Sequence, residues 1–210
     1  MGMELYFAPG SCAFAPLVLL EEAGAEFTPR RLVLADGDQR RPEFLAINPL
    51  GRVPALVVDG TVITEVIAVI TYIAQRFPQA ALLPLGDPLA LGKCYEMMAW
   101  LATNQQVFIA QRWRTERFVD EPAAAVVLKD SALDRLKAGF QQIEDRIAGP
   151  WAMGAAYSAV DPYLGVFYRW AERLEFDPRQ WPRWAEQHRR LLDRPATRAA
   201  LAREAAAVPA

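Results

Sequence analysis

A single cysteine stands in a stretch whose composition suits the start of a helix. Residues 9–16 read PGSCAFAP and separate a short apolar run from the sequence LVLLEEAG. Free N–H groups and the dipole at a helix N-terminus stabilise a thiolate and lower the pKa of a thiol, so Cys12 suits redox or mixed-disulfide chemistry. The commonest use of a free cysteine, however, is as a small, buried, apolar residue. The residues alone leave both interpretations of Cys12 open.

The residues near Cys12 limit the reactions that this cysteine can carry out. A C-x-x-C motif would place its second cysteine at position 15, which is Ala15. A thioredoxin-like dithiol cycle is therefore not expected. Ser11 suits a helix N-cap, because its hydroxyl can accept a hydrogen bond from a backbone N–H of the first turn.

Composition and charge exclude several other functions. The 210-residue chain is 53% hydrophobic and has a net charge of −2, so it lacks the excess of basic residues typical of nucleic-acid-binding proteins. The longest apolar run, residues 66–74, is shorter than the ~18 residues of a membrane span, and no signal-peptide pattern is present. Cys12, Cys94 and the single His188 are too few for a zinc site. We expect a cytoplasmic protein without a metal.

Strand and helix patterns alternate in the first third of the chain. Strands are predicted over residues 4–8 and 26–34, with a helix over 15–24 between them that stops at Gly24. Such a unit gives parallel strands with a right-handed crossover. Pro29 places the second strand at a sheet edge, because proline has no N–H to donate to a neighbouring strand.

A hairpin and an amphipathic helix complete this part. The run VPALVVDGTVITE, residues 53–65, holds two strand-forming segments joined at Asp59-Gly60, which indicates a type I′ turn. The residues that follow carry apolar side chains at helical spacing, at Val66, Val69, Ile70, Ile73 and Phe77. The pattern predicts a small mixed sheet with helices beside it.

The rest of the chain has only helical patterns. Residues 78–88 are rich in Pro and Gly and indicate a linker. Apolar residues then repeat at spacings of three and four, at Cys94, Met97, Met98 and Leu101 and at Leu133, Leu136, Phe140, Ile143 and Ile147. Ser158 and Asp161 form a capping-box pattern before a further helix. We expect an all-α bundle in which Cys94 is buried and unreactive.

Four segments, in order, resemble the glutathione S-transferase family. They are YFAPGSCAFAPLVLLEEAG, NPLGRVPAL, TEVIAVITYI and YSAVDPYLGVFYRW, at residues 6–24, 48–56, 64–73 and 157–170. The first is similar to the N-terminus of bacterial beta-class members, which carry a cysteine at this position. The resemblance covers nearly the whole chain. It implies an α/β thioredoxin-like, glutathione-binding domain over 1–78, a linker over 79–87 and an all-α C-terminal helical bundle over 88–210.

The resemblance also implies roles for individual residues. Cys12 would lie beside the glutathione thiolate, with Ser11 as an alternative hydrogen-bond donor to it. A cis bond before Pro54 would present the Val53 backbone to the cysteinyl part of glutathione. Glu65 and the N–H groups of the helix that begins near Val66 would hold the γ-glutamyl end. Val66 replaces the serine that the family usually has here, so that hydroxyl is lost.

The co-substrate pocket is expected in the helical part. Beta-class members often carry a histidine where this chain has Gln106, which can donate hydrogen bonds but cannot titrate. Phe108 and Trp113 would line an apolar pocket, although large aromatic residues on a helix more often belong to the core.

These features predict a cytoplasmic glutathione S-transferase that transfers the glutathione thiolate to a small apolar electrophile in detoxification, with thiol-disulfide (deglutathionylating) activity as a possible addition. Two alternatives remain, a zeta-like glutathione-dependent isomerase that acts through Ser11 and a non-catalytic ligand-binding homologue. The apolar stripe on residues 94–101 predicts a homodimer.

Overall fold

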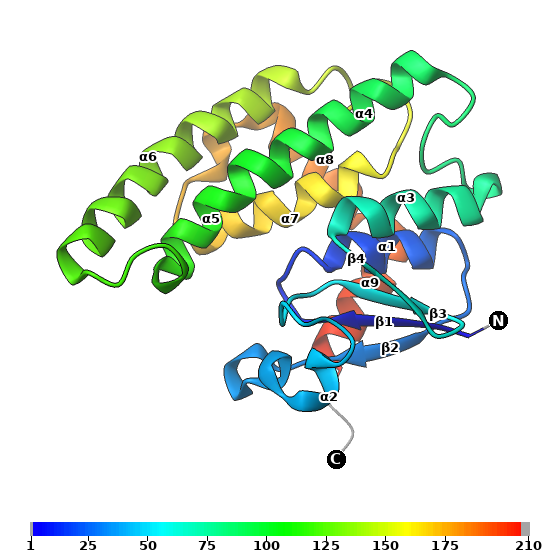
Figure 1. Ribbon diagram of the computed structural model, residues 1–210. Helices are drawn as coiled ribbons and strands as arrows, with labels where there is room; N and C mark the ends of the chain where they lie inside the picture. Colours follow the sequence, from blue (N-terminus) through cyan, green and yellow to red (C-terminus); the bar gives the residue numbers. More distant parts are fainter. Residues whose placement is uncertain (1, 207–210) are drawn as a thin grey trace.

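A four-stranded sheet forms the centre of the first third of the chain (Figure 1). The computed structural model describes residues 2–206. The sheet has the order β2-β1-β3-β4 and is made of β1 (Met3–Phe7), β2 (Thr28–Arg31), β3 (Ala55–Val58) and β4 (Thr61–Thr64). β1 pairs parallel to β2 and antiparallel to β3, which pairs antiparallel to β4. The predicted parallel pair and hairpin are confirmed, although β2 is shorter than expected.

Local backbone chemistry explains the ends of these strands. Asp59 and Gly60 have φ angles of 47° and 82°, the two positive values that a type I′ turn requires. Val58 therefore pairs with Thr61 across a two-residue loop. Pro29 lies in β2 at the edge of the sheet, as its missing N–H predicts.

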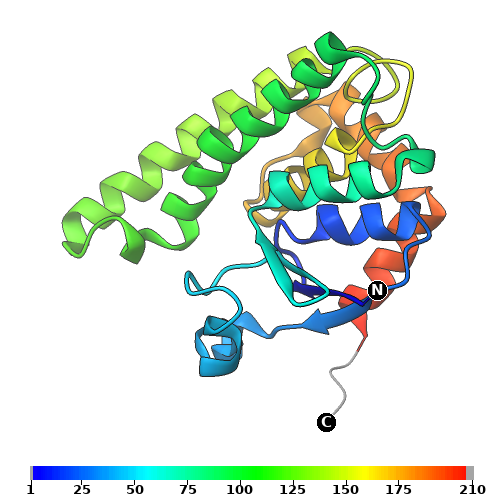
Figure 2. The same cartoon turned by 45° about the vertical axis from the view of Figure 1, so that its right-hand side comes forward.

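Two helices cover one face of the sheet, α1 (Phe14–Glu22) and α3 (Val66–Arg76) (Figure 2). The short helix α2 (Pro42–Leu45) lies on the other side of the sheet. α1 packs against α3 and also against two helices from the end of the chain, α7 (Val160–Arg173) and α9 (Pro195–Ala205). Because neighbours surround it, residues 14–20 of α1 are all buried and show no amphipathic pattern.

The remaining helices are α4 (Pro88–Trp100), α5 (Gln106–Trp113), α6 (Pro122–Arg146) and α8 (Pro182–Leu192). A π-helical segment, Leu101–Gln105, joins α4 to α5 in one continuous run. Such segments are frequent near functional sites, and this one ends directly before Gln106. α5 packs closely on α6, where a Cβ at Gly139 would lie 2.1 Å from the Gln105 amide oxygen. None of the helices within residues 2–206 is long and apolar enough to cross a membrane.

The last helix returns to the sheet. α9 lies in the range predicted for the helical domain, yet it packs against α1. Two ion pairs connect them, Arg194 with Glu22 and Arg203 with Glu21. The first and last helices are therefore joined by side chains nearly the whole sequence apart.

The predicted capping box is confirmed at the start of α7. The Asp161 carboxylate accepts a hydrogen bond from Ser158 N at 2.7 Å, and the Ser158 hydroxyl accepts one from Val160 N at 3.3 Å. Asp161 is fully buried and also accepts from Ala152 N and from the amide of Gln187 in α8. This carboxylate thus connects the helix start to a loop and to a second helix.

Candidate active site

The loop after β1 places Cys12 just before α1. Ser11 N donates to Ala8 O at 3.1 Å, and the Ser11 hydroxyl donates to the same carbonyl at 2.7 Å. The hydroxyl oxygen accepts from Ala13 N at 3.3 Å, so Ser11 caps the turn that leads into the helix. Because α1 begins at Phe14, Cys12 lies two residues before the first helical residue.

The backbone N–H and C=O of Gly10 are both hydrogen-bonded to distant helices. Gly10 N donates to Oε1 of Glu204 in α9 at 2.9 Å, and Gly10 O accepts from the indole of Trp170 in α7 at 2.8 Å. The other carboxylate oxygen of Glu204 pairs with Arg169 at 2.6 Å. Glycine suits this position, because its φ is +71° and a Cβ would lie 3.3 Å from Arg173 Nη1. These contacts fix the loop that carries Cys12.

The Cys12 sulfur has one partner on each side of the site. Its thiol donates to Val53 O at 3.4 Å, and the bond between Val53 and Pro54 is cis, as the family resemblance implied. From the helical side, Gln106 Nε2 donates to the sulfur at 3.7 Å. The Tyr163 hydroxyl donates to Gln106 Oε1 at 2.8 Å and so orients that amide. A chain of hydrogen bonds therefore runs from α7 through α5 to Cys12.

The protonation of Cys12 differs from the expectation. Burial raises the pKa of the Cys12 thiol to about 12, and the negative charge of Glu65 adds to the rise. Hydrogen bonds from its own backbone and from Gln106 oppose this rise without cancelling it. The prediction that the helix start lowers this pKa is wrong for the ligand-free protein, because desolvation of a buried thiolate outweighs the helix dipole. Cys12 is thus a neutral thiol near pH 7.

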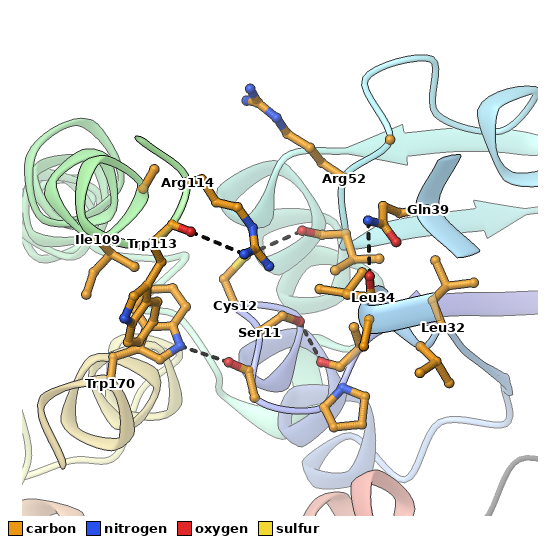
Figure 3. A pocket seen from close by; sticks show the side chains of 18 of the residues that line it. Ser11, Cys12, Leu32, Leu34, Gln39, Arg52, Ile109, Trp113, Arg114 and Trp170 are labelled. Atoms are coloured by element: carbon orange, nitrogen blue, oxygen red, sulfur yellow. Dashed lines mark hydrogen bonds between the residues drawn. The ribbon is translucent and has the colours of Figure 1, made fainter. Parts of the chain in front are cut away.

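A cavity of about 620 Å³ opens between the sheet side and the helices (Figure 3). Its lining brings together five residues that the sequence analysis selected, Ser11, Cys12, Val53, Gln106 and Trp113. Figure 3 shows Trp113 beside Trp170 on the helical wall and Leu34 with Gln39 on the opposite wall. Residues that are far apart in the sequence therefore meet around the Cys12 sulfur.

Other selected residues lie near this cavity or outside it. Glu65 has a φ of 67° and directly precedes α3, whose first residue is the buried Val66. Glu65 does not line the cavity, but its charge adds to the rise in the pKa of Cys12. Pro54, which follows the cis bond, is buried and does not line the cavity. Phe108 does not line the cavity and instead packs under the guanidinium of Arg135, 5.5 Å from the ring centroid.

Several residues of the site were not selected from the sequence. Tyr163 and Trp170 are seven residues apart in α7, which places them on one face of that helix and offers a signal within the quoted motif. Glu204 gave no signal, because its partner Gly10 is 194 positions away. Arginines also line the cavity, at Arg31, Arg52, Arg114, Arg117 and Arg173. Within the described part of the chain, no group of three His, Cys, Asp or Glu residues is arranged to hold a metal.

Comparison with known proteins identifies the family. Residues 1–75 match the model of the glutathione S-transferase N-terminal domain. Glutathione S-transferase GstA of Escherichia coli O157:H7 is 28% identical over 96% of this chain and 98% of its own length. A Sulfitobacter glutathione transferase homologue solved with bound glutathione is 30% identical, with a TM-score of 0.92 over 96% of this chain and 97% of that chain.

A bacterial beta-class glutathione S-transferase from Sphingomonas chungbukensis is also similar. It is 28% identical, with a TM-score of 0.82 over 96% of this chain and 98% of that one. This chain belongs to the glutathione S-transferase family and is of the bacterial, beta-like type.

Proposed function

We propose that the cavity binds glutathione with its sulfur next to Cys12 and transfers that sulfur to an electrophile. The supporting observation is the position of the Cys12 sulfur between the Val53 carbonyl and the Gln106 amide, on the wall of a cavity large enough for a small ligand. Glutathione, a γ-glutamyl-cysteinyl-glycine tripeptide, would pair its cysteinyl backbone with that of Val53, as an added strand does.

The two ends of glutathione meet different chemistry. The first N–H groups of α3 have no acceptor within the helix, so they can hold the γ-glutamyl carboxylate, and Glu65 can pair with the γ-glutamyl ammonium. Val66 offers only its backbone N–H there. The glycine carboxylate lies at the other end of the tripeptide, where Arg31 and Arg52 line the cavity on the sheet side.

The transfer step uses the glutathione sulfur as the nucleophile. The sulfur of the deprotonated glutathione attacks an electrophilic carbon, a C–S bond forms, and the leaving group departs with its bonding electrons. The thiol proton of glutathione goes to solvent before the attack. Cys12, as a neutral thiol, can turn its S–H from Val53 O to the glutathione thiolate and stabilise it, with the Gln106 amide as a second donor.

The raised pKa of Cys12 favours this donor role over a nucleophilic one. A deglutathionylating reaction would need the Cys12 thiolate, which is scarce at neutral pH when the thiol pKa is about 12. Ser11 is the alternative donor, and its hydroxyl is bound to Ala8 O in the ligand-free protein. It would have to rotate before it could reach glutathione. A homodimer, a cytoplasmic location and a role in detoxification remain predictions.

Glutathione affinity and turnover test this proposal together. The protein should bind immobilised glutathione, elute with free glutathione, and conjugate a generic aryl halide. Cys12→Ala should lower kcat/KM about tenfold, the effect of losing one charge-assisted hydrogen bond, while Ser11→Ala should change it little. Cys94→Ala is the matched control, because Cys94 lies outside the cavity lining. If Ser11→Ala abolishes turnover and Cys12→Ala does not, the isomerase-like use of Ser11 replaces this assignment.

A further inference from the structure

The cavity beside Cys12 carries a concentration of positive charge that glutathione alone does not account for. Five arginines line it, and the lining residues within 2–206 include no aspartate or glutamate. The ion pairs of the described chain use other arginines, so none of these five is paired with a carboxylate there. The cavity therefore presents cations that have no carboxylate within ion-pair distance, beside apolar side chains such as Ile109 and Trp113.

One of these arginines, Arg117, is repelled by two of the others. Arg117 is solvent-exposed, yet partial desolvation lowers the pKa of its guanidinium, and the positive charges of Arg52 and Arg114 lower it further. Glu116 opposes this shift, and Arg40 adds to it. A cavity lined by charges of one sign attracts ligands of the opposite sign, so this lining is a candidate site for an anion.

The chain holds the helical-side arginines in place by contacts that leave their charge free. The Arg173 guanidinium lies over the Trp113 ring, 4.9 Å from its centroid, and faces Gly10 of the Cys12 loop. Arg114 donates to Trp113 O at 3.2 Å. Figure 3 shows Arg114 projecting from the α5 side and Arg52 from the loop before β3. On the sheet side, Arg31 Nε is buried with no hydrogen-bond partner among the described residues.

Glutathione can neutralise only a part of this charge. In the binding mode proposed above, its γ-glutamyl carboxylate lies at the start of α3 and its glycine carboxylate meets Arg31 or Arg52. Arg114, Arg117 and Arg173 then remain on the wall where the electrophile must enter. An apolar electrophile would supply no counter-charge to these three arginines.

We propose that the electrophilic co-substrate is a small organic anion, a carboxylate or a similar acid, held by Arg114, Arg117 and Arg173 while its apolar body packs on Trp113 and Ile109. The proposal rests on the transferase function proposed above and changes its substrate class from an apolar electrophile to an acidic one. Arginine suits this role because its planar fork can donate two parallel hydrogen bonds to a carboxylate.

A matched pair of electrophiles tests the proposal by turnover. 4-Chloro-3,5-dinitrobenzoate and its methyl ester present the same ring and the same chloride leaving group but differ in charge. Each enzymatic kcat/KM is divided by the uncatalysed rate constant with glutathione, which removes the difference in intrinsic reactivity. The carboxylate should be preferred about tenfold, the effect of one charge-assisted contact. This preference should shrink in 0.5 M NaCl, because salt screens exposed charges.

Variants assign the preference to the arginines. Arg114→Gln combined with Arg117→Gln should bring the carboxylate-to-ester ratio close to one, and Arg173→Gln should lower it. Arg179→Gln is the matched control, because Arg179 is exposed and paired with Asp177 outside the cavity. Equal use of the two electrophiles by the native protein would overturn the proposal. A parallel loss of both rates in the variants, with the ratio unchanged, would also overturn it, because the arginines would then serve glutathione.

A binding measurement separates this proposal from the transferase function. Unreactive 3,5-dinitrobenzoate and its methyl ester are titrated without glutathione, and quenching of tryptophan fluorescence reports occupancy beside Trp113 and Trp170. Tighter binding of the acid that is lost in the double variant supports the anion site even if neither electrophile is turned over, in which case the transferase proposal fails alone. Binding of the ester as tight as that of the acid overturns the anion site, whatever the turnover.

Discussion

The two sides of the active site are built differently. On the sheet side, Cys12 and the Val53 carbonyl belong to backbone segments beside the sheet. Val53 precedes the cis bond to Pro54, and the loop before Cys12 is held by hydrogen bonds to the N–H and C=O of Gly10. On the helical side, Gln106 and the arginines present long side chains from helices and helix ends. The sheet side thus holds the proposed glutathione site by its backbone and forms a fixed frame. On the helical side, single substitutions can change the side chains that meet the electrophile without altering the fold.

The largest expected effect concerns the reactivity of Cys12 on the sheet side. Cys12 has a pKa of about 12, so its thiolate fraction at pH 7 should be roughly three orders of magnitude below that of a free thiol with a pKa near 8.5. Alkylation by iodoacetamide, followed by peptide mass spectrometry, should therefore be slow at pH 7 and accelerate about tenfold per pH unit up to pH 10.

Cys94 in α4 is the internal control for this measurement. Burial also raises its pKa, it is 2% exposed, and it does not line the cavity. Modification at raised pH should therefore appear at Cys12 before Cys94. The folded protein holds the Cys12 proton more tightly than the unfolded chain, so this residue's contribution to stability should fall as pH rises above about 8.5. Rapid labelling of Cys12 at pH 7 would show that the helix start, and not burial, governs the thiol.

The sheet-side frame also depends on a contact from the end of the chain. Glu204→Ala would leave Gly10 N and the half-buried Arg169 without their shared acceptor, and we expect a loss of about 3 kcal/mol in the free energy of unfolding. Urea denaturation measures this loss. At 10 °C, where the variant stays folded, kcat/KM should still fall severalfold because the loop before Cys12 is released.

A conservative substitution of Glu204 separates the effect of its hydrogen bond to Gly10 from the effect of its charge. Glu204→Gln keeps an oxygen for Gly10 N but removes the charge that pairs with Arg169, so it should retain most of the activity and lose part of the stability. Glu186→Gln, in an exposed ion pair with Arg189, should change neither. Full activity in Glu204→Ala would mean that the frame does not need α9.

The difference between local backbone geometry and long-range side-chain packing also explains which features could be predicted from the sequence. The hairpin turn at Asp59-Gly60, the edge position of Pro29 and the cap at Ser158 follow from backbone rules that act over a few residues, and all three are confirmed. The family resemblance identified the segments around Cys12 and Val53. These features have local signatures, so short stretches of sequence contain them.

Features that depend on long-range packing were missed. The pKa of Cys12 is raised mainly by burial, and its sulfur contacts Val53 and Gln106 from distant segments, none of which helix position alone reveals. Phe108 was expected in the pocket, but its rotation about α5 directs it to Arg135. The arginines of the cavity come from four separate segments, and no spacing in the sequence relates them.

The smallest expected effect concerns the orientation of the Gln106 amide on the helical side. The Tyr163 hydroxyl donates to Gln106 Oε1, which leaves Nε2 to face the Cys12 sulfur. Tyr163→Phe removes this donor but keeps the ring, which is fully buried, so the free energy of unfolding should fall by only about 1 kcal/mol. The freed Gln106 amide can then rotate and present either its oxygen or its nitrogen to the Cys12 sulfur.

This loss of orientation should appear in catalysis as a small change in kcat with KM for glutathione almost unchanged, because no group that holds the tripeptide is altered. We expect kcat to fall two- to fivefold, equivalent to about 0.5–1 kcal/mol. Gln106→Ala should lower kcat at least as much, and the double variant should be no worse than Gln106→Ala alone, since Tyr163 acts through that amide. Independent, multiplicative losses in the double variant would give Tyr163 a direct role and remove the relay from α7.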